Sequence, residues 1–294
     1  MIDRVTKALL VGFVGCMLSF AGQGQGSMKV HNDIEYARVG GEGLGLDLYL
    51  PGSESLNGII VWIHGGAWRS GSKDKLPVIG LVEKGWTVAS IDYRLSGQAR
   101  FPAQIHDIKA AIRFLRAKSQ EYGYRSENVL IMGSSAGGHL AALAGVTNGH
   151  KVLEGQVGEF SNESSDIQGI VSLYGASNLT TILDQSTPHG LSVRVPALDL
   201  FIGGQPDDLV EATRLASPVF HVDANDPPLL MIHGDQDPQM PINQSHELQG
   251  KYDTVGARVI FEALHGAKHG GAMFYDAERL ERMHRFLLGI VGGY

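Results

Sequence analysis

Six short apolar segments recur along the chain, separated by longer polar or helix-like stretches. They are rich in β-branched residues and lie at 58–66, 87–93, 128–134, 167–175, 227–235 and 257–264. Such alternation is typical of a mostly parallel sheet whose two faces are covered by helices. Two earlier segments, 34–39 and 45–50, flank the glycine-rich stretch 40–45 and predict an opening β-hairpin. We therefore predict an α/β fold with a mostly parallel central sheet and helices on both faces.

Two of the intervening stretches show helical periodicity. In segment 101–123, apolar residues recur at three- and four-residue steps, and the opposite face takes Arg113, Arg116 and Lys118. Segment 276–292 repeats the pattern. Both helices are expected to pack an apolar face on the sheet.

Two other stretches interrupt the alternation. Residues 148–166 are polar and rich in Gly, Glu and Ser, and residues 177–218 are long for a plain connection. The second stretch is a natural place for a lid or substrate-facing insertion. No composition shift marks a domain boundary, so we predict one catalytic domain over residues 27–294.

The first 26 residues resemble a targeting segment. Two basic residues precede an uncharged apolar run of 13 residues, and small residues follow. The run is too short to span a membrane as a helix, and the arrangement predicts a cleaved signal peptide at 1–26. The protein is then periplasmic or secreted. We favour ordinary cleavage over lipid attachment at Cys16, and Met28 remains an alternative start of a cytoplasmic form.

Charge and composition exclude several classes of function. The net charge is −7 and no long run of Lys or Arg occurs, which argues against nucleic-acid partners and anionic membrane surfaces. Cys16 is the only cysteine, so the mature chain has no disulfides. Histidines lack metal-ligand spacing and no phosphate-binding loop precedes a helix. We predict neither a metal nor a cofactor, and the sequence leaves the oligomeric state undetermined.

The stretch VLIMGSSAGGHLAALA, residues 129–144, runs from an apolar strand through a glycine-rich turn into a small-residue helix. G-x-S-x-G fits only with Ser135 at its centre, because centring on Ser134 requires glycine at positions 132 and 136. A sharp strand-to-helix turn exposes the serine hydroxyl, and flanking glycines let the neighbouring backbone pass. Ser135 is therefore the candidate nucleophile.

A nucleophilic serine needs a base, and the base needs an orienting acid. The turn after segment 227–235 offers Asp235 and Asp237, and the turn after 257–264 offers His265 and His269. In this type of sheet the order serine, acid, histidine is expected. We favour Asp237, because Asp235 is placed to brace its own turn, and we favour His269, because His265 adjoins the strand.

Small residues after the first parallel strand supply candidate oxyanion donors. Gly65, Gly66 and Ala67 let backbone N–H groups converge, and the N–H of Ala136 follows the nucleophile. A plain glycine turn after a strand is the alternative. The position beside the predicted serine turn favours the oxyanion hole.

Two aromatic residues adjoin these segments. Trp68 follows the oxyanion segment, and Tyr174 ends a strand near the same sheet edge. Both are candidates for lining the substrate cleft. For Trp68, packing in the core or at the rim is the competing interpretation.

Four motifs together resemble the α/β-hydrolase superfamily. They are HGGAW, GSSAGGHLAAL, HGDQDPQMP and HGAKHGG, at 64–68, 133–143, 233–241 and 265–271. The sequence is similar to secreted bacterial esterases and lipases, a group that includes feruloyl and acetyl-xylan esterases, and more distantly to kynurenine formamidases. The resemblance covers about residues 30 to 290 and implies the α/β-hydrolase fold.

The resemblance also implies roles for individual residues. It places the nucleophile at Ser135, the acid at Asp237 and the base at His269. It implies oxyanion donors at Gly66, Ala67 and Ala136. The chain departs from relatives at Met240, where they usually carry valine, which concerns loop packing more than chemistry.

These observations predict a serine carboxylic-ester hydrolase for short acyl or aryl esters. Export favours a small-molecule or carbohydrate-linked ester, such as an acetyl or feruloyl group on a sugar. Amide hydrolysis, as by an arylformamidase or a peptidase, is the alternative, since the same residues serve both bonds. An inactive binding protein on this scaffold is a third interpretation, disfavoured because every catalytic position is filled.

Overall fold

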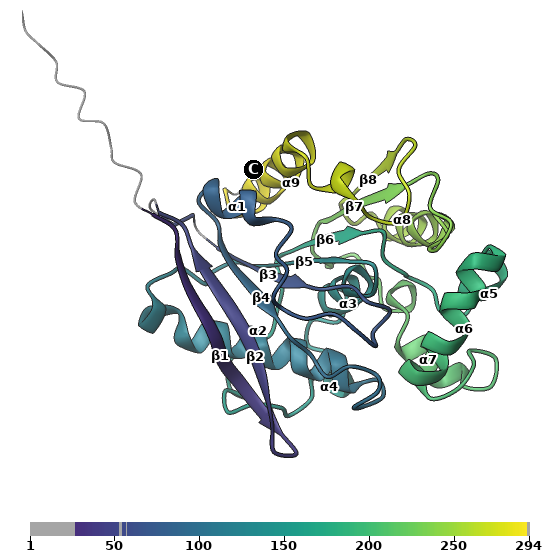
Figure 1. Ribbon diagram of the computed structural model, residues 1–294, viewed down its shortest axis with the longest axis horizontal. Helices are drawn as coiled ribbons and strands as arrows, with labels where there is room; N and C mark the ends of the chain where they lie inside the picture. The colour runs from purple at the N-terminus through teal and green to yellow at the C-terminus, as the bar shows by residue number, and fades with distance from the viewer. Residues whose placement is uncertain (1–26, 53–54, 57, 293–294) are drawn as a thin grey trace, which may run out of the picture.

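The computed structural model describes residues 27–52, 55, 56 and 58–292. Within them, eight strands form one sheet in the order β1-β2-β4-β3-β5-β6-β7-β8 (Figure 1). The strands are β1 Lys29–Val39, β2 Glu42–Leu50, β3 Ile59–Ile63, β4 Thr87–Ile91, β5 Val129–Ser134, β6 Gly169–Leu173, β7 Leu229–Gly234 and β8 Val259–Leu264. β1–β2 and β2–β4 pair antiparallel, and every pair from β4 to β8 is parallel. The predicted mostly parallel sheet is confirmed, and all six apolar segments form strands.

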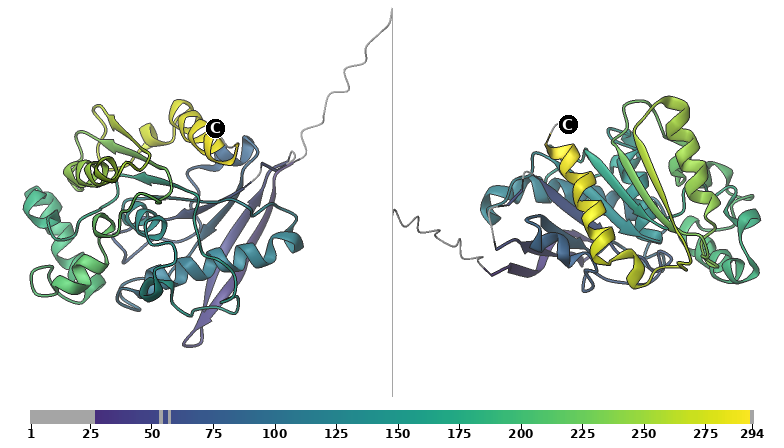
Figure 2. Two further views of the ribbon diagram at one scale, coloured as in Figure 1. Left: turned by 180° about the vertical axis from the view of Figure 1, so that it is seen from behind. Right: turned by 90° about the horizontal axis from the view of Figure 1, so that it is seen from above.

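Helices cover both faces of the sheet (Figure 2). They are α1 Ile79–Glu83, α2 Ala103–Tyr122, α3 Ala136–Gly145, α4 Lys151–Glu154, α5 Ile182–Gln185, α6 Pro188–Ile202, α7 Val210–Leu215, α8 Asn243–Val255 and α9 Ala277–Val291, with short 3-10 turns η1 Pro218–Phe220 and η2 Ala272–Phe274. Along β3, Val61 belongs to the core cluster that includes residues of α2, α3 and α8, whereas Trp62 belongs to the cluster that includes residues of α1 and α9. Because strand side chains alternate, two separate cores form.

The opening hairpin turns more tightly than the sequence suggests. Its turn is Gly40–Gly41, with φ of 60° and 90°, and Gly43 and Gly45 lie inside β2. Two consecutive positive φ values match the twist of a two-residue hairpin and favour glycine at both positions. The predicted turn over residues 40–45 is therefore two residues long.

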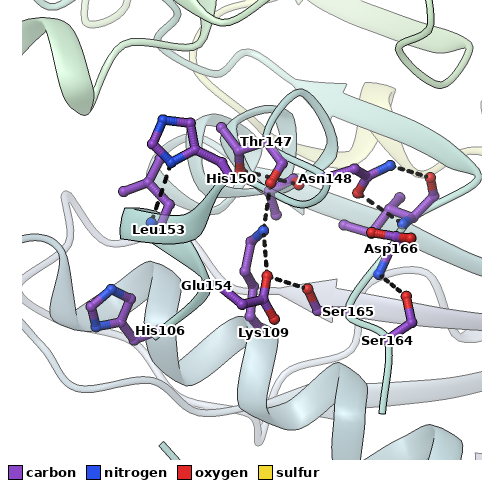
Figure 3. Close-up of polar contacts among 12 residues, drawn as sticks. His106, Lys109, Thr147, Asn148, His150, Leu153, Glu154, Ser164, Ser165 and Asp166 are labelled. Carbon is purple, nitrogen blue, oxygen red and sulfur yellow. Dashed lines mark hydrogen bonds and ion pairs between the residues drawn. The ribbon is translucent and has the colours of Figure 1, made fainter. Parts of the chain in front are cut away.

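Helix α2 is confirmed, but its polar face is not fully exposed. Lys109 and Arg113 are buried, and both form ion pairs with Glu154 of α4. Lys109 Nζ also donates to the carbonyl oxygen of Thr147 at 2.6 Å (Figure 3). Arg113 was expected on the polar, exposed face of this helix. That expectation is wrong, because residues 148–166 cover this face.

That covering stretch is held by side-chain bonds to backbone. Asn148 bonds both the N–H and the carbonyl oxygen of Ile167, each at 3.0 Å, and Ser165 donates to Glu154 at 2.7 Å (Figure 3). Polar residues here thus close a loop over α2 rather than forming a separate unit.

Residues 177–218 contain α5, α6 and α7, which group together at one side of the molecule (Figure 1). Their role as a lid stays a prediction. The predicted signal peptide at 1–26, with Cys16, lies outside the described residues. In the part of the chain that the structure describes, no helix has the length and apolar character needed to cross a membrane.

Candidate active site

Ser135 lies at the sharp turn between β5 and α3. Its φ is 55° and its ψ is −118°, a conformation that costs a non-glycine residue about 1 to 3 kcal/mol. A Cβ at Gly133 would lie 2.3 Å from the carbonyl oxygen of Gly137, and one at Gly137 would lie 2.1 Å from that of Ile63. Glycine is thus required at both motif positions for steric reasons.

The structure brings Ser135, His269 and Asp237 together. His269 Nε2 lies 2.9 Å from Ser135 Oγ, and His269 Nδ1 lies 2.6 Å from Asp237 Oδ2. The three residues follow β5, β8 and β7, whose carboxyl ends share one edge of the sheet. The Asp237 side chain is fully buried, whereas 14% of the His269 side chain is exposed.

The surroundings of Asp237 keep it ionised. Burial raises its pKa, but hydrogen bonds from His233, His269 and the backbone N–H of Met240 outweigh burial and hold the pKa well below its ordinary value. Its Oδ1 accepts from the N–H groups of Gln239 and Met240, both at 2.8 Å. Since an ionised carboxylate only accepts, His269 Nδ1 carries a proton and Nε2 is free to accept from Ser135.

His233 contacts the catalytic acid Asp237 and its loop, and the sequence interpretation did not identify it. It is buried at the end of β7, and its Nε2 lies 3.0 Å from the carbonyl oxygen of Met240 and 3.4 Å from Asp237 Oδ2. Its Nδ1 contacts Ser245 Oγ at 2.8 Å. A polar residue at a buried strand position next to the acid turn is the signal that points to it.

The rejected acid and histidine bond to one another. Asp235 Oδ2 lies 2.7 Å from His265 Nδ1, and Asp235 Oδ1 accepts from the Gly266 N–H at 2.7 Å. The His265 side chain is 95% exposed. This pair ties the turns after β7 and β8 together.

Two of the predicted oxyanion donors, Gly66 and Ala67, line the same cavity as Ser135. Gly66 and Ala67 have φ of 113° and 51°, and among the described residues their N–H groups have no acceptor. Ala136 is the first residue of α3, whose first-turn N–H groups lack partners within the helix. All three donors are therefore free to bind an oxygen beside Ser135.

A cavity of about 370 Å³ opens over these groups. It is lined by Gly65, Gly66, Ala67, Arg69, Ser70, Ser134, Ser135, Tyr174, Val193, Gln239 and His269. Tyr174, proposed from sequence to line the cleft, is among them, and its ring packs edge-on to His269 with centroids 4.9 Å apart. Val193 comes from α6, so the 177–218 stretch contributes a wall of the cavity.

Trp68 does not line this cavity. Its side chain is fully buried, stacks on Phe201 of α6 at 4.5 Å, and donates from Nε1 to His139 Nδ1 at 3.1 Å. The suggestion of a substrate-facing Trp68 is therefore corrected to core packing. Helix α6 covers the indole, which the local sequence around Trp68 gives no means of anticipating.

Known proteins show the same architecture. Residues 46–252 match the BD-FAE family. The chain belongs to this family. Esterase LipC of Mycobacterium tuberculosis is 32% identical over 77% of this chain and 59% of its own length. The chain thus spans little more than half of that curated relative.

Two solved structures resemble this BD-FAE member over nearly its whole length. A truncated carbohydrate esterase from gut microbiota is 30% identical, has a TM-score of 0.80, and aligns over 92% of this chain and 98% of its own. A bifunctional GH43-CE protein of Bacteroides eggerthii is 35% identical with a TM-score of 0.80, covering 90% of this chain and 35% of its own. The α/β-hydrolase fold and the resemblance to esterases are confirmed.

Proposed function

We propose that this protein hydrolyses carboxylic esters through an acyl-enzyme on Ser135. His269 Nε2 takes the hydroxyl proton as Ser135 Oγ bonds to the ester carbonyl carbon, and the N–H groups of Gly66, Ala67 and Ala136 bind the oxyanion. The bond to the alcohol oxygen breaks, and the alcohol leaves with the proton from His269. Water activated by His269 then releases the carboxylic acid and regenerates the serine.

One observation carries this proposal: His269 bridges Ser135 Oγ at 2.9 Å and Asp237 Oδ2 at 2.6 Å. Hydrogen-bond reach on both sides is what a base between nucleophile and acid needs. The buried, ionised Asp237 stabilises the imidazolium that forms during attack.

The proposed substrates are short acyl or aryl esters linked to carbohydrate. Support comes from the likeness to a carbohydrate esterase and from the cavity, whose lining includes several polar side chains. Its volume of about 370 Å³ lies at the lower end of the usual range for ligand pockets, which favours short over long acyl chains. Export to the periplasm or beyond fits such a substrate and stays a prediction.

The test is the Ser135→Ala variant assayed on p-nitrophenyl acetate. Loss of the nucleophile is expected to lower kcat by about a millionfold, and to abolish covalent labelling by a fluorophosphonate probe. Ser161→Ala is the matched control, because Ser161 is an exposed serine in the stretch between α4 and β6. A folded Ser135→Ala protein that keeps most of its activity or its labelling would refute the assignment.

A further inference from the structure

Arg69 stands out among the residues that line the active-site cavity. Of these described residues it alone carries a permanent charge. It follows the oxyanion segment by two residues, and its backbone N–H donates to the carbonyl oxygen of Gly66 at 3.1 Å. The turn that shapes the oxyanion hole therefore also fixes where the guanidinium side chain starts.

The guanidinium of Arg69 has no partner within the described residues. Most other arginines there differ: Arg94 pairs with Asp107, Arg113 with Glu154 and Arg125 with Glu127. The catalytic acid Asp237 is fully buried and bonded to His269 and to its own loop. It therefore does not pair with Arg69, which is exposed.

An unpaired cation in the lining of the cavity that contains Ser135 favours ligands that carry a negative charge. The chain carries −7, so anionic ligands gain nothing from the overall field and depend on local attraction. A guanidinium offers a planar fork of donors that matches a carboxylate with two parallel hydrogen bonds. Ser70 and Gln239 also line this cavity and add polar groups to it.

We propose that Arg69 binds a carboxylate on the alcohol part of the substrate, so that the preferred substrates are acyl esters of acidic sugars such as uronic acids. In this proposal the alcohol part lies at the exposed Arg69, and the short acyl group lies at Val193 and the buried Tyr174, which supply apolar surface. This inference rests on the proposed ester hydrolysis and narrows its substrate class.

The experiment compares two substrates that differ only in charge: monoacetylated methyl glucuronide and the matching neutral glucuronamide, with acetate release as the readout. The wild-type enzyme is expected to prefer the uronate by about fivefold in kcat/KM, mainly through KM, as for a partly exposed charge pair. The preference should shrink in high salt, because exposed charges are screened.

Three variants test the assignment to Arg69. Arg69→Gln should remove the preference, and Arg69→Lys should keep part of it because the charge is retained without the guanidinium fork. Arg125→Gln, which removes the same charge before β5 at the opposite end of the strands, should keep all of it.

The results distinguish a failure of the Arg69 inference from a failure of the proposed ester hydrolysis. Equal rates on the two sugars, or a preference that survives Arg69→Gln, would overturn the inference while p-nitrophenyl acetate hydrolysis still supports the proposed function. A preference for a carboxylate on the acyl side, seen with p-nitrophenyl hemisuccinate over p-nitrophenyl butyrate and absent from the sugar pair, would also overturn it. A wild-type protein that hydrolyses none of these esters would refute both.

Discussion

Replacing Asp237 by asparagine gives a sharp test of how the histidine is oriented. Asp237 Oδ1 accepts from the N–H groups of Gln239 and Met240, and Oδ2 faces His269 Nδ1. An asparagine oxygen will take the Oδ1 position, because the flipped amide would set its NH₂ against two close backbone donors and leave them unsatisfied, at about 1 to 3 kcal/mol each. At the Oδ2 position the NH₂ group meets a single and more distant donor, His233 Nε2 at 3.4 Å. The NH₂ group therefore faces His269.

That orientation traps His269 in the wrong tautomer. An NH₂ donor makes Nδ1 an acceptor and moves the proton to Nε2, where it points at Ser135 Oγ and blocks proton acceptance. We expect kcat to fall by about ten-thousandfold, the effect of the equivalent change in a serine protease. This corresponds to about 5.4 kcal/mol of lost transition-state stabilisation.

The assay is kcat/KM on p-nitrophenyl acetate at pH 7.5, with circular dichroism and thermal unfolding as checks of the fold. Asp235→Asn is the control, because Asp235 bonds to the exposed His265, and a surface change of this kind is worth about twofold at most. A folded Asp237→Asn enzyme within tenfold of wild-type activity would refute the tautomer argument.

Two further predictions concern stability. Gly137→Ala places a Cβ 2.1 Å from the carbonyl oxygen of Ile63, so we expect the free energy of unfolding, measured by urea titration, to fall by about 1 to 3 kcal/mol. Gly250→Ala, in open space on α8, should instead raise it by about 0.5 to 1 kcal/mol. Equal effects of the two substitutions would contradict the steric argument. Burial lowers the pKa of His139 to about 4 from an ordinary 6.5, so the unfolded chain binds more protons between these values and stability falls as pH drops through this window. His139 should thus contribute a loss of about 2 kcal/mol between pH 7 and pH 5, and His139→Gln should lose this part of the pH dependence.

The sheet and the residues around Ser135 were accessible to sequence reasoning because their signals are local. Buried strands read as apolar runs, and the glycines at 133 and 137 are required by contacts that recur wherever this turn occurs. Asp237 was favoured over Asp235 because Asp235 is placed to brace its own turn, and the structure places the two acids in separate hydrogen-bonded pairs.

Features that depend on distant segments were not accessible. Trp68 is buried because Phe201, more than a hundred positions later, stacks on it, and Arg113 is buried because Glu154 reaches it from α4. Neither partner has a periodic or spacing relation to the residue it covers. His233 differs, because its partners Asp237 and Met240 lie only four and seven positions away and its polar side chain at a buried strand position is the local signal that sequence reasoning left unused.

The strained backbone conformation at Ser135 lowers thermal stability, whereas the serine side chain at this position is needed for catalysis. A φ of 55° suits glycine, and the position is held by its N–H to Leu173 and by its carbonyl oxygen to the His139 N–H. Removing the side chain would relieve local strain while deleting the nucleophile. Libraries screened for thermal tolerance alone should therefore drift toward Ser135→Gly, and selection of a more robust enzyme has to score hydrolysis in every round.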